Sequence, residues 1–137
     1  MSHSMPQVFS RETARKGATG LAALRGAVGV AAWVIPAQAL RPWVGSVAAN
    51  SAGGRLLGRS LGARDIALGA GALLSERHDT PVRGWLEAGA LADVGDLIAT
   101  LYAFRKLPKL TRWGVLGLTA GAAVAGGLLA PCVDEAG

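Results

Sequence analysis

Five charged residues inside apolar stretches are the part of this chain whose types and spacing suit chemistry. One stretch holds Arg59, Arg64 and Asp65, and the next holds Asp93 and Asp96. Ionisable side chains inside strongly apolar helices are costly, so they usually face the interior of a bundle and pair with one another. The sequence therefore predicts one buried polar site made by these five side chains.

The charged turn at residues 76–81 sets the expected register of the two stretches. Arg64 and Asp93 lie at similar distances along the chain on either side of this turn. At ~1.5 Å per helical residue, both are about 15 Å from it. We therefore expect Arg64 to meet Asp93, and we expect Asp96 to contact residues 59–61 or an arginine among them.

The chemistry suited to such a site is acid–base catalysis. Carboxyl groups held at unequal distances from an arginine bind protons with different strength, so one can act as base or nucleophile while another acts as acid. The alternative is a set of salt bridges that only fixes helix register. Three carboxylates against two arginines are more than register requires, and both interpretations stay open.

Glycines accompany the charged residues on both stretches. Gly58, Gly62 and Gly69 share a helical face with Asp65, and Gly89 shares one with Asp93. Glycines allow helix backbones to approach closely. We expect these faces to form the seam on which the second and third stretches pack.

The composition predicts a membrane protein. Of 137 residues, 51% are hydrophobic and 17% are charged, and the mean hydropathy is +0.37. A soluble domain of this size must cover its core with more polar surface. The 20 glycines occur among alanine, leucine and valine, as in closely packed membrane helices.

Four apolar stretches each approach the ~20 residues needed to cross a ~30 Å hydrocarbon core. We expect an all-α fold, an integral membrane four-helix bundle over residues 18–131, with spans at about 18–40, 55–75, 82–104 and 113–130. Residues 1–17 are expected to be a polar N-terminal segment and residues 132–137 a tail. The stretch 45–54 is expected to be a loop in which Asn50 or Ser51 caps the next helix. Pro36 is expected to kink the first span, and Pro131 to end the last.

Several partner classes are excluded by the same composition. The net charge is +5, but one tyrosine and two phenylalanines cannot form a base-stacking platform, so no nucleic-acid partner is expected. The basic residues flank apolar runs and suit anionic lipid head groups. His3 and His78 are isolated and Cys132 is a single cysteine. No metal, cofactor or intrachain disulfide is therefore predicted.

Basic residues do not decide the membrane orientation. Six lie on the side of the N-terminus and seven on the opposite side: Arg11, Arg15, Lys16, Arg25, Arg77 and Arg83, against Arg41, Arg55, Arg59, Arg105, Lys106, Lys109 and Arg112. Leaving out Arg55 and Arg59 as residues within a helix gives six against five, which weakly favours the N-terminus on the inner side. The alternative is a dual topology with antiparallel dimers.

Residues 62–69, together with residues 92–96, resemble a family of small four-helix membrane proteins classed as a domain of unknown function, with bacterial members. The resemblance covers most of residues 18–130. Some similar membrane proteins in fungal polyketide pathways are regarded as epoxide hydrolases or cyclisation enzymes. The residue types are also similar to the Asp-Arg-Asp arrangement of soluble limonene-type epoxide hydrolases, in which one aspartate activates water and the other protonates the epoxide oxygen. That likeness is one of chemistry and not of fold.

Three functions fit these expectations. The first is a membrane hydrolase or cyclase acting on a lipophilic, epoxide-type substrate, with Asp93 or Asp65 activating water and Arg64 orienting the carboxyl groups. The second is a proton- or cation-coupled transporter or channel subunit working as a homo-oligomer. The third is a non-catalytic membrane assembly partner. An enclosed cavity favours the first, a polar path at an oligomer axis the second, and a dry, fully paired cluster the third.

Overall fold

The computed structural model describes residues 9–109 and 111–134, and no strand occurs among them. The helices are α1 (Arg11–Val34), α2 (Pro36–Val44), α3 (Ser46–Asn50), α4 (Ala52–Arg77), α5 (Arg83–Ala103) and α6 (Arg112–Val133), with a 3-10 turn η1 at Phe104–Lys106. The all-α class predicted from the sequence is confirmed.

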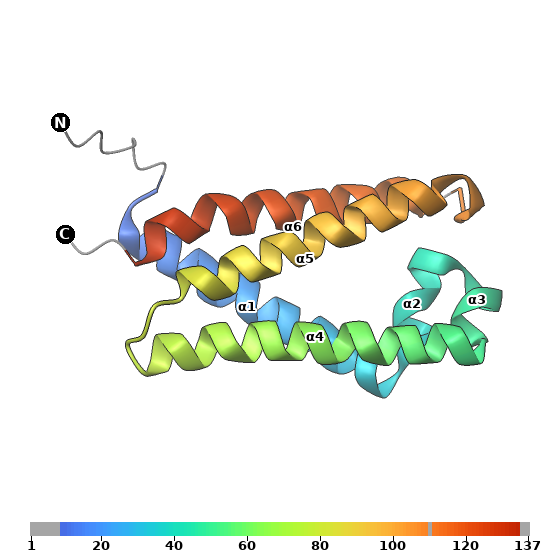
Figure 1. The fold of residues 1–137 in the computed structure, drawn as a ribbon, viewed down its shortest axis with the longest axis horizontal. Coiled ribbons are helices and arrows are strands. Elements are labelled where there is room, and N and C mark those ends of the chain that lie inside the picture. Colours follow the sequence, from blue (N-terminus) through green and yellow to red (C-terminus); the bar gives the residue numbers. More distant parts are fainter. Residues whose placement is uncertain (1–8, 110, 135–137) are drawn as a thin grey trace.

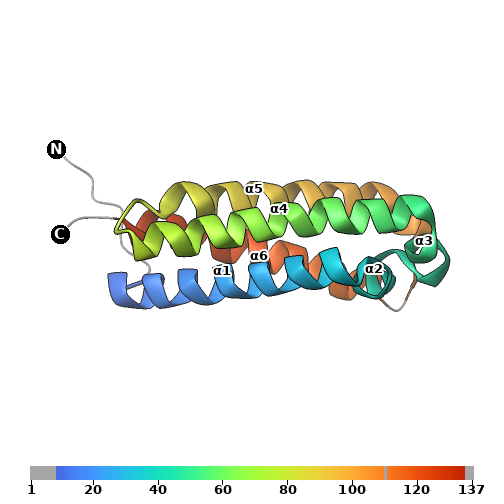
Figure 2. The ribbon, with the colours of Figure 1, turned by 90° about the horizontal axis from the view of Figure 1, so that it is seen from below.

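Four long helices, α1, α4, α5 and α6, lie side by side, and the short α2 and α3 gather at the end away from the α4–α5 turn (Figures 1 and 2). Helix α1 packs most extensively against α4, and α5 against α6. Helices α4 and α5 are neighbours along the chain but share few contacts. The expectation that the glycine faces of these two helices pack on each other is therefore wrong.

The glycine face of α4 packs against α1. A Cβ atom at Gly62 would lie 2.6 Å from the carbonyl oxygen of Gly29, and one at Gly69 would lie 2.6 Å from that of Ala22. The predicted close approach of backbones is present, but with a different partner. The reason is that α1 has a matching row of small buried residues: Ala18, Ala22, Gly29 and Ala32. Two helices whose facing residues are all small approach more closely than two helices of which one carries large side chains.

Helix α1 starts earlier and ends earlier than predicted. The Ser10 hydroxyl accepts a hydrogen bond from the backbone N–H of Thr13 at 3.3 Å and caps the helix, so residues 11–17 are helical rather than a polar extension. Residues 1–8 lie outside the described residues. The helix ends at Val34, and Pro36 begins α2, because proline favours a first helical position, where no N–H is needed.

Two further boundaries differ from the sequence prediction. The stretch expected as a loop, residues 45–54, contains α3 and the first turn of α4. The predicted cap is confirmed at Ser51, whose Oγ accepts from the Gly54 N–H at 2.9 Å. Helix α6 continues through Pro131 to Val133, because Cys132 and Val133 are buried in the core cluster and this burial favours the extra turn.

Two of the long helices, α1 and α6, are long and apolar enough to cross a membrane. Helix α4 has 26 residues and α5 has 21, so both match the length of a membrane span. They carry the charged residues of the predicted site, which lower their hydropathy. Composition, and not length, thus separates α1 and α6 from α4 and α5.

Candidate functional site

Five charged side chains from three helices form a continuous chain of ion pairs near the middle of the long helices. Arg25 of α1 lies between Asp65 of α4 and Asp93 of α5: its Nη1 donates to Asp65 Oδ1 at 3.2 Å and its Nη2 donates to Asp93 Oδ2. Arg64 of α4 lies between Asp65 and Asp96. The order of the groups is Asp93, Arg25, Asp65, Arg64, Asp96, and we call it the charge network.

Arg25 lies against a glycine on the facing helix. A Cβ atom at Gly89 of α5 would lie 3.4 Å from Arg25 Nε and Nη2, which is an ordinary van der Waals contact. Arg25 Nη2 also approaches the Gly89 carbonyl oxygen at 3.5 Å. The side chains of Arg25 and Asp93 are 11% and 9% exposed. This half of the charge network is buried between α1, α4 and α5.

Arg64 forms the more accessible half of the charge network. Its Nη1 and Nη2 donate to the two carboxylate oxygens of Asp96 at 2.9 and 2.8 Å. Its Nε and Nη2 donate to Asp65 Oδ1 at 3.2 and 3.1 Å. The Arg64 side chain is 31% exposed and that of Asp96 is 16% exposed. A bidentate pair of this kind fixes both side chains in one geometry.

A polar link ties α2 to the helix that carries Asp93 and Asp96. The Trp43 indole N–H donates to the Thr100 hydroxyl at 3.1 Å. Thr100 in turn donates to the backbone carbonyl of Asp96 at 2.6 Å. Thr100 is buried, so this link holds α5 in place one turn beyond Asp96.

The structure brings four of the five predicted residues together and leaves one apart. Asp65, Asp93, Asp96 and Arg64 all belong to the charge network. Within the described residues, Arg59 forms no ion pair, and it lines a surface hollow instead. The predicted pairing of Arg64 with Asp93 is wrong, because Arg25 pairs with Asp93 and Arg64 pairs with Asp96 one turn further on. The predicted pairing of Asp96 with Arg59 is wrong for the same reason.

Arg25 is the residue that sequence reasoning missed. Counted from a span start at residue 18, Arg25 lies about two turns from the helix end, but α1 begins at Arg11, which moves Arg25 to its middle. A signal for this was present. Arg25 follows the small buried residues Ala18 and Ala22 and precedes Gly29 at helical spacing, so it shares the face that packs inward.

The space beside the charge network is small. The hollow lined by Arg25, Leu21, Trp85 and Gly89 has a volume of about 10 Å³, which is at most room for one water molecule. All three carboxylates already accept hydrogen bonds from arginine. In this arrangement the space beside the charge network is too small for a molecule larger than water, which would reach it only if the helices moved apart.

Glu87 pairs with Arg83, whose Nε lies 2.6 Å from Glu87 Oε1, and this pair lies outside the charge network. Among the described residues, no group of three histidine, cysteine or acidic side chains is placed to hold a metal ion.

In comparisons with known proteins, no family model matches the chain, and neither does a curated protein or a solved structure.

Proposed function

We propose that this chain is a multi-pass membrane protein in which all four long helices cross the bilayer. Large apolar side chains point outward along these helices, among them Leu24, Leu91, Leu118 and Val124. In the most apolar part of α6, only 17% of the residues are buried. Contact between such a surface and lipid chains has no free-energy cost, whereas its contact with water is unfavourable.

The placement of charge and aromatic rings supports this location. The ionisable residues at mid-length of α4 and α5 are paired inside the bundle, as such residues usually are in membranes. Exposed aromatic residues stand near the helix ends: Trp85 at one end, and Trp33, Tyr102 and Trp113 toward the other. Amphipathic rings favour these interfacial depths.

The charge network acts, in this proposal, as an acid–base centre. The observation that carries it is the alternating order, in which each arginine lies between two aspartates and Asp65 serves both. When all five groups are ionised, three negative charges face two positive ones. A surplus charge far from water is costly, and one bound proton removes it. A carboxyl group that takes up and releases that proton has the chemistry of a general acid and base.

The reaction that we propose is hydrolytic opening or cyclisation of a lipophilic epoxide. Asp93, Arg25 and Asp65 reproduce the Asp-Arg-Asp order of the resemblance noted above. One carboxylate takes a proton from water while the water oxygen attacks an epoxide carbon. The other, protonated, gives its proton to the epoxide oxygen as the C–O bond breaks. The substrate enters from the lipid between α4 and α5, which share few contacts.

A non-catalytic assembly role is the second candidate. Complete pairing of the carboxylates and a hollow of about 10 Å³ favour it. A paired network of this kind fixes which helices meet and in which register. In that case the charge network supports the fold, and α6 and the other outward faces meet a partner in the membrane.

Replacing each aspartate by asparagine separates the two candidates. Asp65→Asn, Asp93→Asn and Asp96→Asn keep the side-chain shape but remove the exchangeable proton. For an enzyme, at least one variant should lower the rate of diol formation from lipophilic epoxides by about 10²-fold or more, while the protein still inserts into membranes. Glu87→Gln is the matched control, because Glu87 pairs with Arg83 near a helix end, outside the charge network. Full activity in all three variants contradicts catalysis. Loss of membrane assembly in all three favours the structural role.

A further inference from the structure

One end of the molecule carries basic residues without acidic ones. No aspartate or glutamate occurs from Pro36 to Arg64 or from Leu97 to Val133. These segments supply α2, α3 and the start of α4, together with η1 and the start of α6, which gather at one end (Figures 1 and 2). The bond from Trp43 to Thr100 joins the two sets of segments there. We call this the basic end.

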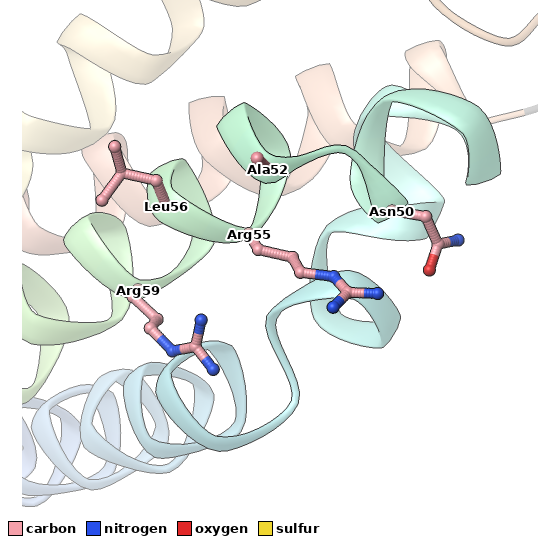
Figure 3. A pocket seen from close by; sticks show the side chains of 5 residues that line it. All are labelled: Asn50, Ala52, Arg55, Leu56 and Arg59. Carbon is pink, nitrogen blue, oxygen red and sulfur yellow. The ribbon is translucent and has the colours of Figure 1, made fainter.

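Within the basic end, two arginines line a hollow on the surface. Arg55 and Arg59 lie four residues apart on α4, and their guanidinium groups extend from one side of the helix, with Asn50 of α3 beside Arg55 (Figure 3). The hollow that they line has a volume of about 440 Å³. A second hollow of about 270 Å³, which reaches to Gln38 of α2, shares all three residues.

In the part of the chain that the structure describes, Arg55 and Arg59 have no negatively charged partner. Like charges four residues apart on a helix repel each other, and within the described residues neither Arg55 nor Arg59 forms an ion pair. At the opposite end, by contrast, Lys16 pairs with Glu12 and Arg83 pairs with Glu87. An anion placed between Arg55 and Arg59 would remove the repulsion.

The backbone under the arginines is fixed. Ser51 Oγ donates to the Ala48 carbonyl at 2.7 Å and accepts from the Gly54 N–H at 2.9 Å. Asn50 Nδ2 donates to the Ser46 carbonyl at 2.8 Å. A Cβ atom at Gly58 would lie 2.7 Å from Pro36 Cβ, so α4 and α2 are in close contact. Arg55 and Arg59 thus extend from a backbone held by local hydrogen bonds and by close packing on α2.

We propose that Arg55, Arg59 and Asn50 bind the phosphate of an anionic phospholipid. Guanidinium groups match phosphate oxygens with paired, charge-assisted hydrogen bonds, and the Asn50 amide is a further donor. Apolar side chains border the arginines, with Leu56 in the first hollow and Val34 and Ile35 in the second. A phosphate that carries hydrocarbon chains satisfies both surfaces. The choice of a lipid over a free phosphate rests on the proposed membrane location.

The test measures binding of short-chain phosphatidylglycerol to the full chain in uncharged detergent micelles by titration calorimetry. Short-chain phosphatidylcholine and glycerol 3-phosphate are the two comparison ligands. We expect phosphatidylglycerol to bind most tightly and the double variant R55Q/R59Q to weaken it by about tenfold or more, as loss of charge-assisted hydrogen bonds implies. The control R105Q/K106Q removes equal charge from the same end outside the hollows, and we expect a change of less than about threefold.

Equal losses in the two double variants would overturn the site, since binding would then follow overall charge. Binding of glycerol 3-phosphate as tight as that of phosphatidylglycerol would overturn the lipid assignment. Membrane fractionation of the same unmodified chain tests the proposed location separately. All four substituted side chains are exposed, so the variants should keep the helical content that circular dichroism measures.

Discussion

The Arg64 guanidinium holds both carboxylate oxygens of Asp96, at 2.9 and 2.8 Å, and joins α4 to α5 at mid-length. Those two helices share few other contacts. The pair therefore sets their spacing at the point where the proposed substrate would enter. Its geometry depends on the planar guanidinium, which a lysine ammonium does not reproduce.

Replacing Arg64 by lysine should destabilise the protein by about 1–2 kcal/mol, because one ammonium cannot hold both Asp96 oxygens and still reach Asp65. Denaturant unfolding in detergent, followed by circular dichroism, measures the change. Arg59→Lys is the control on the same helix, since Arg59 has no ion pair in the part of the chain that is described. Equal stability of Arg64→Lys and the unmodified chain would show that the bidentate pair contributes nothing.

Arg25 should contribute more to the stability of the fold than any of the site residues predicted from the sequence. Arg25→Met leaves Asp65 and Asp93 near each other without the cation between them, and removing one partner of a buried pair costs about 3–5 kcal/mol. The double variant Arg25→Met with Asp93→Leu should recover part of this loss, because no unpaired charge remains at Asp93. Unfolding free energies of the two single variants and the double variant give the coupling energy, and purely additive losses would rule out the ion pair.

Close packing of α1 on α4 predicts a sharp difference between two glycines. Gly62→Ala should destabilise the protein by about 1–3 kcal/mol, because its Cβ would lie 2.6 Å from the Gly29 carbonyl oxygen and overpacking has that cost. Gly95→Ala on α5 places its Cβ in open space and should be neutral or slightly stabilising. Thermal unfolding of both variants in the same detergent measures the two changes in stability. Equal effects would mean that α1 and α4 are not in close contact.

Composition and hydropathy were enough to predict the helical class and four of the five residues that gather at mid-length. Asp65, Asp93, Asp96 and Arg64 could be grouped because charges in apolar helices must find one another. Their pairing could not be predicted, because it depends on which helix α4 packs against. By pattern alone, the glycine face of α4 could pack on α1 or on α5. The matching small residues on α1, such as Ala22 and Gly29, decide for α1.

The helix ends show the same limit. Hydropathy marks where a helix meets the edge of an apolar layer, whereas the helix itself ends where its backbone hydrogen bonds end. The Ser10 cap extends α1 beyond its apolar part, which is why Arg25 is central rather than near an end. At the other boundary, the break before Pro36 follows from the missing proline N–H, but it divides one apolar run into α1 and α2.

The positions of the basic residues in the structure predict the membrane orientation that sequence counts left open. Arg25 belongs to the charge network and no longer counts toward either end. Arg55 and Arg59 are exposed at the basic end and do count. The basic end then has seven Lys and Arg residues against five at the end that holds the α4–α5 turn. The end richer in Lys and Arg faces the cytoplasm, so the α4–α5 turn should lie on the outer side.

Accessibility of single cysteines to a membrane-impermeant maleimide tests this orientation. In a Cys132→Ser background, Thr80→Cys places a thiol in the exposed α4–α5 turn, and Val47→Cys places one on the exposed surface of α3. Intact cells should label only the Thr80→Cys variant, and lysed cells should label both. The reverse pattern would refute the orientation, and labelling of both variants in intact cells would indicate that copies insert in both directions. The result also decides which leaflet supplies lipid to Arg55 and Arg59, because those residues lie at the same end as Val47.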